Sequence, residues 1–430
     1  MKSDSSVVIR PARSVSGALR LPGDKSISHR YAMLGAIAHG TTKLENYSTG
    51  ADCASTLGCL KTLGISWQKN DSAVEIVGAG LNLYPPTSPL DCGNSGSTMR
   101  MLSGILAGQD FTSELIGDES LSRRPMSRII KPLEMMGAKI AAIDGGRPPL
   151  RVTGGSLRAI SYDTPVPSAQ VKTALLFAGL YASGETRVQE SVRTRDHGEI
   201  ALRAFGAVVA QQGNESRISG GQQLHAIESQ VPGDLSSAAF FLCAAGLFPG
   251  SQLTIDSLLL NPTRARLLDV LIGMGVGITI TQLEEKHGEL IGTAQVTGKA
   301  LTGATISGAP TAELIDEIPV LAAIAPYTAN GIEIRDAREL RVKESDRIAA
   351  VATNLRAMGA RLEEFEDGLK IPGGQKLHGA ELDSFGDHRI AMAFAVAALR
   401  AQGETRINRS DAAVISYPAF YETLESVSVR

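Results

Sequence analysis

The stretch Leu21-Pro22-Gly23-Asp24-Lys25-Ser26-Ile27-Ser28-His29-Arg30 opens an apolar helical run over residues 31–38 that is followed by a glycine. Its Pro-Gly pair interrupts whatever structure comes before, and Asp24 or Ser26 can cap the helix that follows. A capped helix start leaves first-turn backbone N–H groups available to an outside anion. With a lysine and an arginine at the same end, this stretch predicts an anion pocket at a helix N-terminus.

The same kind of segment recurs six times along the chain. Each copy has a polar or Gly/Pro-rich start, a helix of small residues, a glycine and a short strand. A second helix, ending in Leu-Gly, Met-Gly or Phe-Gly, follows in most copies. The six copies begin at Gly23, Gly93, Pro167, Gly233, Ile315 and Gly386. Helices interleaved with short strands predict an α/β protein built from six repeats.

Two of the six copies begin with the same tripeptide, Pro22-Gly23-Asp24 and Pro232-Gly233-Asp234, which divides the repeats into three and three. We place the domain crossings there. One predicted domain spans residues 21–232. The other combines residues 1–20 with residues 233–430, because we assign the N-terminal strand, residues 7–19, to the C-terminal half. Two crossings predict a hinge and a cleft between the domains, where small ligands commonly bind.

Composition excludes several classes of protein. The net charge of −3 gives no bulk attraction to nucleic acid or to an anionic membrane. The most apolar runs, residues 238–247 and 390–399, are shorter than the ~20 residues of a membrane helix. The start of the chain lacks the apolar core of a signal peptide. We therefore expect a cytoplasmic protein that binds neither nucleic acid nor membrane.

Cysteine and histidine spacing argues against a metal site. The four cysteines form no CxxC pair and no zinc spacing, so we expect reduced, mostly packed thiols. The seven histidines offer no metal triad. The glycine-rich stretch at residues 93–98 lacks the lysine of a P-loop, and no Rossmann GxGxxG follows a strand. We therefore expect no metal and no nucleotide loop.

Cationic residues gather in a few segments. They are Arg123, Arg124, Arg128, Arg193, Arg195, Arg341, Lys343, Arg347 and Arg389. Each one alone fits a solvated helix end. Together, at helix N-termini where the helix dipole disfavours cations, they call for a compensating anion. A substrate with phosphate and carboxylate groups would supply it, because arginine makes bidentate contacts with both.

Two carboxylates could carry acid–base chemistry. Asp316 precedes an apolar run, residues 318–324, and could simply cap its helix; Glu344 could be a surface partner of Arg347 at i,i+3. The functional reading requires both carboxylates to face the cationic residues as acid or base groups.

The motifs jointly resemble one family, the 5-enolpyruvylshikimate-3-phosphate synthases (3-phosphoshikimate 1-carboxyvinyltransferases). The matching pieces run in family order along the whole chain. They are Gly23-Asp24-Lys25-Ser26 with His29-Arg30, Asn94-x-Gly96 with Met99-Arg100, Arg124-Pro125-Met126, Ser168-Ala169-Gln170-Val171-Lys172, Asn261-Pro262-Thr263-Arg264, Val342-Lys343-Glu344-Ser345-Asp346-Arg347 and Asp387-His388-Arg389.

The resemblance implies a two-domain fold with three βαβαββ repeats in each domain and helix N-termini facing the interdomain cleft. It implies transfer of the enolpyruvyl group of phosphoenolpyruvate to the 5-hydroxyl of shikimate-3-phosphate, in aromatic amino-acid biosynthesis, with no cofactor. The implied catalytic residues are Asp316, Glu344 and Lys25. Implied ligands of phosphoenolpyruvate are Lys25, Gly96, Arg124, Gln170, Arg347 and Arg389. Implied ligands of shikimate-3-phosphate are Lys25, Ser26, Arg30, Ser168, Ala169, Gln170, Arg195, Asp316 and Lys343. We expect a monomer.

Several motifs are similar to the class II branch of the family, but Gly96 stands where glyphosate-tolerant class II enzymes carry alanine. The family resemblance therefore implies sensitivity to glyphosate, which occupies the phosphoenolpyruvate site. One alternative is a UDP-N-acetylglucosamine enolpyruvyl transferase, which would be expected to carry a Lys-Asn pair near the first motif and a catalytic cysteine on a mobile loop. Here Ser26 follows Lys25, and no cysteine lies near residues 123–128. The other alternative is a non-catalytic anion-binding protein, which would not need Asp316 and Glu344 together.

Overall fold

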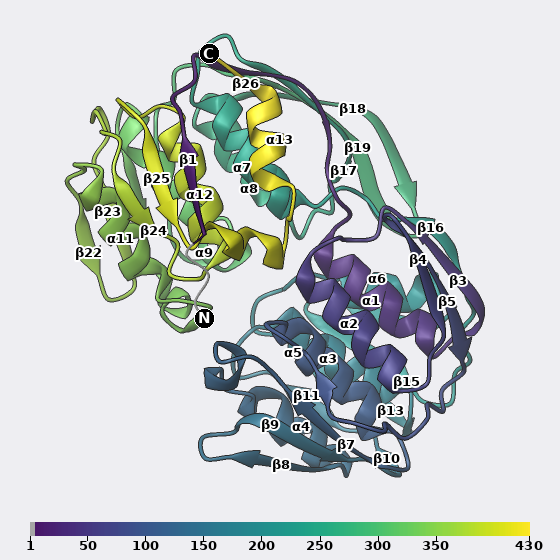
Figure 1. Cartoon of the computed structure of the whole chain (residues 1–430). Helices are drawn as coiled ribbons and strands as arrows, with labels where there is room; N and C mark the ends of the chain where they lie inside the picture. Colours follow the sequence, from purple (N-terminus) through teal and green to yellow (C-terminus); the bar gives the residue numbers. More distant parts are fainter. Residues whose placement is uncertain (1–4) are drawn as a thin grey trace. The chain divides into compact units, whose positions relative to one another are not determined.

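The computed structural model describes residues 5–430, and within that range the chain forms two compact units (Figure 1). Unit 1 contains the N-terminal segment up to Leu21, together with Pro232–Glu285 and Leu290–Arg430. Unit 2 contains Pro22–Val231 and the short segment Lys286–Glu289. The sequence analysis did not foresee this last segment, which returns to unit 2 at the turn between two long strands.

In the described residues, unit 2 contains three four-stranded sheets with one common pattern. The first two strands of each sheet are parallel, and the remaining neighbours are antiparallel. In sheet order the strands are β16 (Glu228–Gln230), β3 (His39–Glu45), β5 (Ala73–Ala79) and β4 (Trp67–Asn70); β6 (Leu90–Asp91), β7 (Thr112–Ile116), β9 (Arg147–Thr153) and β8 (Lys139–Ile143); β11 (Ser161–Asp163), β13 (Glu185–Gln189), β15 (Glu215–Ser219) and β14 (Val209–Gln212). A two-stranded sheet pairs β10 (Leu157–Arg158) with β12 (Ala182–Ser183).

Unit 1 also has three sheets in the described range, each with one parallel pair. In sheet order their strands are β18 (Gly277–Lys286), β19 (Glu289–Thr297), β17 (Gln252–Leu259), β2 (Ser14–Arg20) and β26 (Ser428–Val429); β20 (Ala304–Ile306), β21 (Ile332–Ile334), β23 (Gly368–Ile371) and β22 (Glu363–Phe365); β1 (Ser6–Ile9), β25 (Thr405–Asn408) and β24 (Glu381–Asp383).

Helices connect many of the successive strands, and the parallel pair β6–β7, for example, is joined by a helical crossover. Those of unit 2 are α1 (Lys25–Ala36), α2 (Ala51–Thr62), α3 (Gly96–Ala107), η1 (Leu121–Arg123), α4 (Ser127–Met136), α5 (Ala169–Gly179) and α6 (His197–Ala204). Those of unit 1 are α7 (Leu235–Gly246), α8 (Arg266–Gly273), α9 (Ala309–Glu313), α10 (Ile318–Ile324), η2 (Ala325–Tyr327), η3 (Arg338–Val342), α11 (Arg347–Ala357), α12 (His388–Ala398), η4 (Ser410–Ile415) and α13 (Phe420–Val427). The order β6-α3-β7-α4-β8-β9 is one complete βαβαββ repeat, and β20-α10-β21-α11-β22-β23 follows the same order after α9, so the predicted fold class is confirmed.

The core of each unit is made of helices rich in small residues. Every residue of α7, α10 and α12 is buried, and these three helices contact one another in unit 1. In unit 2, α3 and α5 approach so closely that a Cβ on Gly104 would lie 2.1 Å from the carbonyl oxygen of Ala174. Helix starts are therefore fixed with little freedom, and these starts carry the candidate site residues.

The sequence predicted one N-terminal strand over residues 7–19, and this prediction is wrong because the structure has two strands in this stretch. β1 pairs with β25 and β2 pairs with β17, in two different sheets of unit 1. The break contains Pro11, which has no N–H to donate to a sheet ladder. Both strands belong to unit 1 together with the C-terminal part of the chain.

Candidate active site

In unit 2, most of the candidate residues lie near the starts of α1, α3 and α5, while Arg124 follows η1 and Arg195 precedes α6. The predicted cap of α1 is resolved in favour of Asp24, whose side chain accepts a hydrogen bond from Ile27 N at 2.8 Å. Ser95 caps α3 and Ser168 caps α5 in the same way. These caps fix the positions of Lys25, Gly96 and Ala169, the first helical residue of each helix.

Lys25 and Arg30 are both constrained by α1 and its neighbours. Lys25 Nζ lies 2.9 Å from Asp52 Oδ2 on α2. The Arg30 guanidinium donates to Ser26 O at 2.9 Å and to Thr173 Oγ1 on α5 at 2.9 Å. Burial lowers the pKa of Arg30 to about 10, with the charge of Arg195 acting in the same direction against nearby carboxylates. Arg30 and Arg195 therefore lie close enough for each to influence the other's charge.

Gly96 lies between two guanidinium groups. A Cβ at this position would be 3.2 Å from Arg100 Nη1 and 3.4 Å from Arg124 Nη1. Arg124 donates to Asn94 Oδ1 at 2.9 Å, and Arg100 donates to Gln170 Oε1 at 2.7 Å. The sequence analysis quoted Arg100 in a motif but gave it no role. Its bond to Gln170 connects the start of α3 with the start of α5.

Lys172, quoted in the same motif as Gln170, is not available to a ligand. It is almost completely buried, and its ammonium lies 2.7 Å from Glu190 Oε2 and 2.9 Å from Glu199 Oε1. Burial acts to lower the pKa of Lys172, but the two carboxylates outweigh burial and hold that pKa above its ordinary value. Lys172 therefore supports α5 and α6 from inside unit 2.

In unit 1, the candidate residues surround the Asp316 carboxylate. Asp316 lies between α9 and α10, and Glu317 rather than Asp316 is the N-cap residue of α10. Asp316 Oδ1 is 3.5 Å from Arg347 Nη1 and 3.6 Å from Lys343 Nζ, and Oδ2 is 4.0 Å from Arg389 Nη2. A partly exposed carboxylate among three cations suits a group that accepts a proton from a bound anionic substrate.

Arg347 is the most constrained cation of unit 1. Its side chain is 1% exposed, and its Nε donates to Asp387 Oδ2 at 2.8 Å. Its Nη2 donates to Glu344 Oε2 at 2.6 Å, so the predicted i,i+3 pair exists and lies in the same cluster as Asp316. Burial acts to raise the pKa of Asp387, but the Arg347 guanidinium outweighs burial and holds that pKa below its ordinary value.

Asp387 was quoted in a family motif, but its role in holding Arg347 and Arg389 in place was not predicted. It caps α12 through Arg389 N at 2.9 Å and also accepts hydrogen bonds from Arg347 and Ser345. Its position two residues before Arg389, at a helix start, was the only available signal. The pairing with Arg347, 40 positions earlier, could not be derived from local sequence.

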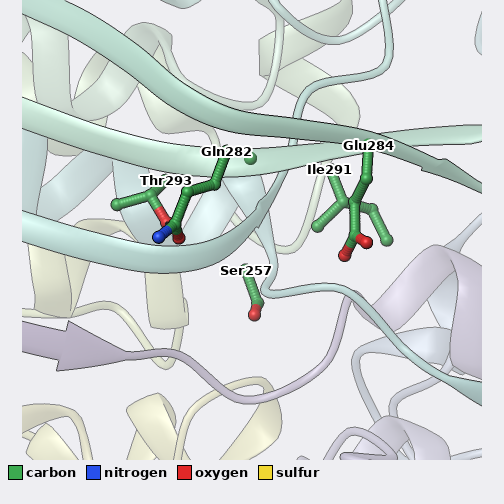
Figure 2. A pocket seen from close by; sticks show the side chains of 6 residues that line it. Ser257, Gln282, Glu284, Ile291 and Thr293 are labelled. Carbon is green, nitrogen blue, oxygen red and sulfur yellow. The ribbon is translucent and has the colours of Figure 1, made fainter.

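A hollow of about 190 Å³ lies elsewhere on unit 1, among strands β17, β18 and β19 (Figure 2). Its lining is polar, with one carboxylate and no cationic side chain. The lining residues are Ser257, Gln282, Glu284, Ile291, Gly292 and Thr293. Such a lining does not suit an anionic ligand, and none of these residues is a predicted site residue.

Two features are absent from the residues that the structure describes. No group of three or more His, Cys, Asp or Glu side chains in residues 5–430 could hold a metal ion. No helix in the same range is long and apolar enough to cross a membrane.

We predict that Arg347→Leu lowers the free energy of unfolding by about 3–5 kcal/mol at pH 7, because it leaves Asp387 charged and buried without its partner. Arg356→Leu is the matched control on the same helix: Arg356 is half exposed and pairs with Glu364 at 3.1 Å, so its loss should cost less than about 1 kcal/mol. Denaturant unfolding measures both. Equal losses of stability in the two variants would contradict the role of the buried Arg347–Asp387 pair.

The same pair predicts a pH dependence. The depressed pKa of Asp387 stabilises the folded state above the ordinary aspartate pKa of about 3.9, and this stabilisation is lost as the pH falls below that value. In Arg347→Leu this acid-sensitive contribution should disappear, so the difference in stability between wild type and variant should shrink on acidification.

The chain matches the family model of EPSP synthase (3-phosphoshikimate 1-carboxyvinyltransferase) over residues 9–424. It is 61% identical to the 3-phosphoshikimate 1-carboxyvinyltransferase of Koribacter versatilis (strain Ellin345), covering 99% of this chain and 100% of that protein. It is 58% identical to the one of Solibacter usitatus (strain Ellin6076), covering 98% and 99%. The solved EPSP synthase of Acinetobacter baumannii superposes with a TM-score of 0.89 at 40% identity, covering 99% of both chains. The chain therefore belongs to the EPSP synthase family.

Proposed function

We propose that this enzyme transfers the enolpyruvyl group of phosphoenolpyruvate to the 5-hydroxyl of shikimate-3-phosphate and releases phosphate, in the shikimate pathway. One observation carries the assignment to particular residues. In a chain that matches the family over residues 9–424, the Asp316 carboxylate lies within 4.0 Å of three cationic side chains. Both substrates are multiply charged anions, so a site for them needs such cations.

The proposed ligands of phosphoenolpyruvate come from both units. They are Lys25, Gly96, Arg124 and Gln170 of unit 2, and Arg347 and Arg389 of unit 1. Arg100 is added to the set, because its guanidinium lies against Gly96 and bonds Gln170. Arginine suits this role, since its planar fork matches carboxylate and phosphate oxygens.

The proposed ligands of shikimate-3-phosphate are Lys25, Ser26, Ser168, Ala169, Gln170 and Arg195 of unit 2, and Asp316 and Lys343 of unit 1. Arg30 is included in this set because of its positive charge. It is only 3% exposed, and two of its nitrogens already bond Ser26 and Thr173. We therefore assign Arg30 to positioning Ser26 and to the positive potential of the site.

The reaction forms a bond between the 5-oxygen and C2 of phosphoenolpyruvate and breaks the bond between C2 and the phosphate oxygen. Asp316 accepts the hydroxyl proton, which raises the nucleophilicity of the oxygen. Glu344 and Lys25 are proposed to deliver and remove the proton at the methylene carbon. The arginines compensate the charge that gathers on phosphate as it leaves. No step of this chemistry calls for a cofactor.

Two rival functions are less well supported. A UDP-N-acetylglucosamine enolpyruvyl transferase would need a catalytic cysteine on a mobile loop, whereas Cys53, Cys59, Cys92 and Cys243 are all buried. A non-catalytic anion-binding protein would not need the Asp316 and Glu344 carboxylates beside the same arginine. A cytoplasmic location and a monomeric state remain part of the proposal.

We predict that Asp316→Asn lowers kcat by about 10²-fold or more while shikimate-3-phosphate still binds, because asparagine keeps the shape but cannot accept the proton. Phosphate release measures turnover, and calorimetry measures binding. Asp367→Asn is the matched control, since Asp367 also lies near a cation, Arg335 at 3.7 Å, but in the partly exposed turn between β22 and β23. An Asp316→Asn enzyme within a few-fold of wild type would remove Asp316 from the mechanism.

We also predict that glyphosate inhibits the wild-type enzyme and that Gly96→Ala raises its inhibition constant at least about tenfold more than the KM for phosphoenolpyruvate. The added methyl would press on the Arg100 and Arg124 guanidiniums, 3.2 and 3.4 Å away, and shrink the space for the longer inhibitor.

The control for this test is Gly58→Ala on α2, where nothing lies within 4 Å of an added Cβ. Glyphosate is titrated against all three proteins at fixed phosphoenolpyruvate. Wild type that resists millimolar glyphosate, or a Gly96→Ala variant as sensitive as wild type, would refute the steric argument.

A further inference from the structure

Four fully buried side chains form an unbroken chain of hydrogen bonds near the N-terminal ends of three helices in unit 2. His29 Nδ1 on α1 lies 2.7 Å from Thr56 Oγ1 on α2, and Thr56 Oγ1 lies 2.7 Å from Thr98 Oγ1 on α3. Thr98 Oγ1 in turn lies 2.8 Å from the oxygen of Ser95, the N-cap of α3. We call these four residues the relay.

The direction of the relay follows from its donors. Ser95 Oγ accepts hydrogen bonds from both the hydroxyl and the backbone N–H of Thr98. With the Thr98 hydroxyl donating to Ser95, the consistent assignment has the Thr56 hydroxyl donate to Thr98 and the Nδ1–H tautomer of His29 donate to Thr56. Burial, with Lys25 and Arg30 nearby, lowers the pKa of His29 well below its ordinary value, so the ring is a neutral donor.

The relay runs parallel to the contacts of the proposed phosphoenolpyruvate ligands. Lys25 is one helical turn before His29, and Asp52 is one turn before Thr56, so Lys25–Asp52 and His29–Thr56 are successive connections between the same two helices. Ser95 immediately precedes Gly96, and the Thr98 hydroxyl also approaches Asp52 O at 3.5 Å. The relay therefore joins the segment that carries Lys25 to the segment that carries Gly96.

We propose that Thr56 and Thr98, with His29, are positioning residues that fix Lys25 relative to Gly96 and thereby set the affinity for phosphoenolpyruvate. The proposal rests on the proposed function, because it takes Lys25 and Gly96 as ligands of that substrate. Gly96 is a proposed ligand of phosphoenolpyruvate alone, whereas Lys25 is only one of several proposed ligands of shikimate-3-phosphate, so the affinity for phosphoenolpyruvate should change more. A buried network with all hydroxyls in sequence specifies one arrangement of its helices.

A buried threonine outside the relay serves as the control for a purely structural role. Thr42, on β3, is also fully buried, and its hydroxyl has no hydrogen-bond partner among the described residues. Removing that hydroxyl as Thr42→Val changes a buried threonine of unit 2 without touching the relay. It is therefore the matched control for Thr56→Val and Thr98→Val, which keep the side-chain shape and remove one hydrogen-bonding group.

Steady-state kinetics and calorimetry test the relay. We expect Thr98→Val and Thr56→Val to raise the KM for phosphoenolpyruvate about 5- to 10-fold, the usual effect of losing one buried hydrogen bond. The Kd for shikimate-3-phosphate should change less than this KM, because Lys25 is only one of its proposed ligands, and both constants should stay within about twofold in Thr42→Val. Thr98→Ser keeps the hydroxyl and should restore the wild-type KM. Measuring both valine variants keeps the test valid if one of them folds poorly.

Specific outcomes would overturn the proposal. An unchanged KM for phosphoenolpyruvate in both valine variants would overturn the relay alone, provided that the wild type turns over. An equal rise in the KM for phosphoenolpyruvate in Thr42→Val would show that the relay acts only through ordinary packing. A Thr98→Ser variant as impaired as Thr98→Val would show the same. A wild-type enzyme that releases no phosphate with both substrates would instead overturn the proposed function, and the relay proposal with it.

Discussion

The ion pair between Arg347 and Asp387 is the contact on which the candidate site of unit 1 depends. The buried Arg347 guanidinium needs partners for its charge, and the carboxylates of Asp387, Glu344 and Asp316 provide them. Asp387 also caps α12, so one carboxylate fixes both the start of that helix and the arginine of α11. The acid–base groups are thus fixed by the same contacts that stabilise the fold.

In unit 2, other residues stabilise the cations near helix starts. Cations at helix N-termini are disfavoured by the helix dipole, and here a carboxylate from a neighbouring helix offsets the charge of Lys25. Caps at Asp24, Ser95 and Ser168 fix the three helix starts. In both units, rigid helix starts carry the ligand residues and polar contacts between helices set their spacing, which is what preorganised binding of small anions requires.

Local sequence predicted much of this arrangement. The capped start at Asp24, the repeated helix–strand order and the family motifs were enough for the fold class and for most candidate residues. Contacts between distant segments could not be predicted, because they depend on tertiary packing. The pairs Lys25–Asp52, Arg100–Gln170 and Arg347–Asp387 are examples. The division of the N-terminal strand into β1 and β2 was missed for the same reason, since each strand joins a different sheet.

The most direct test of the account is to incubate the purified protein with phosphoenolpyruvate and shikimate-3-phosphate, and to measure released phosphate together with the mass of the product. The account predicts phosphate release that requires both substrates and equals, mole for mole, the 5-enolpyruvylshikimate-3-phosphate formed. Tight binding of both substrates without phosphate release, or release from phosphoenolpyruvate alone, would contradict it.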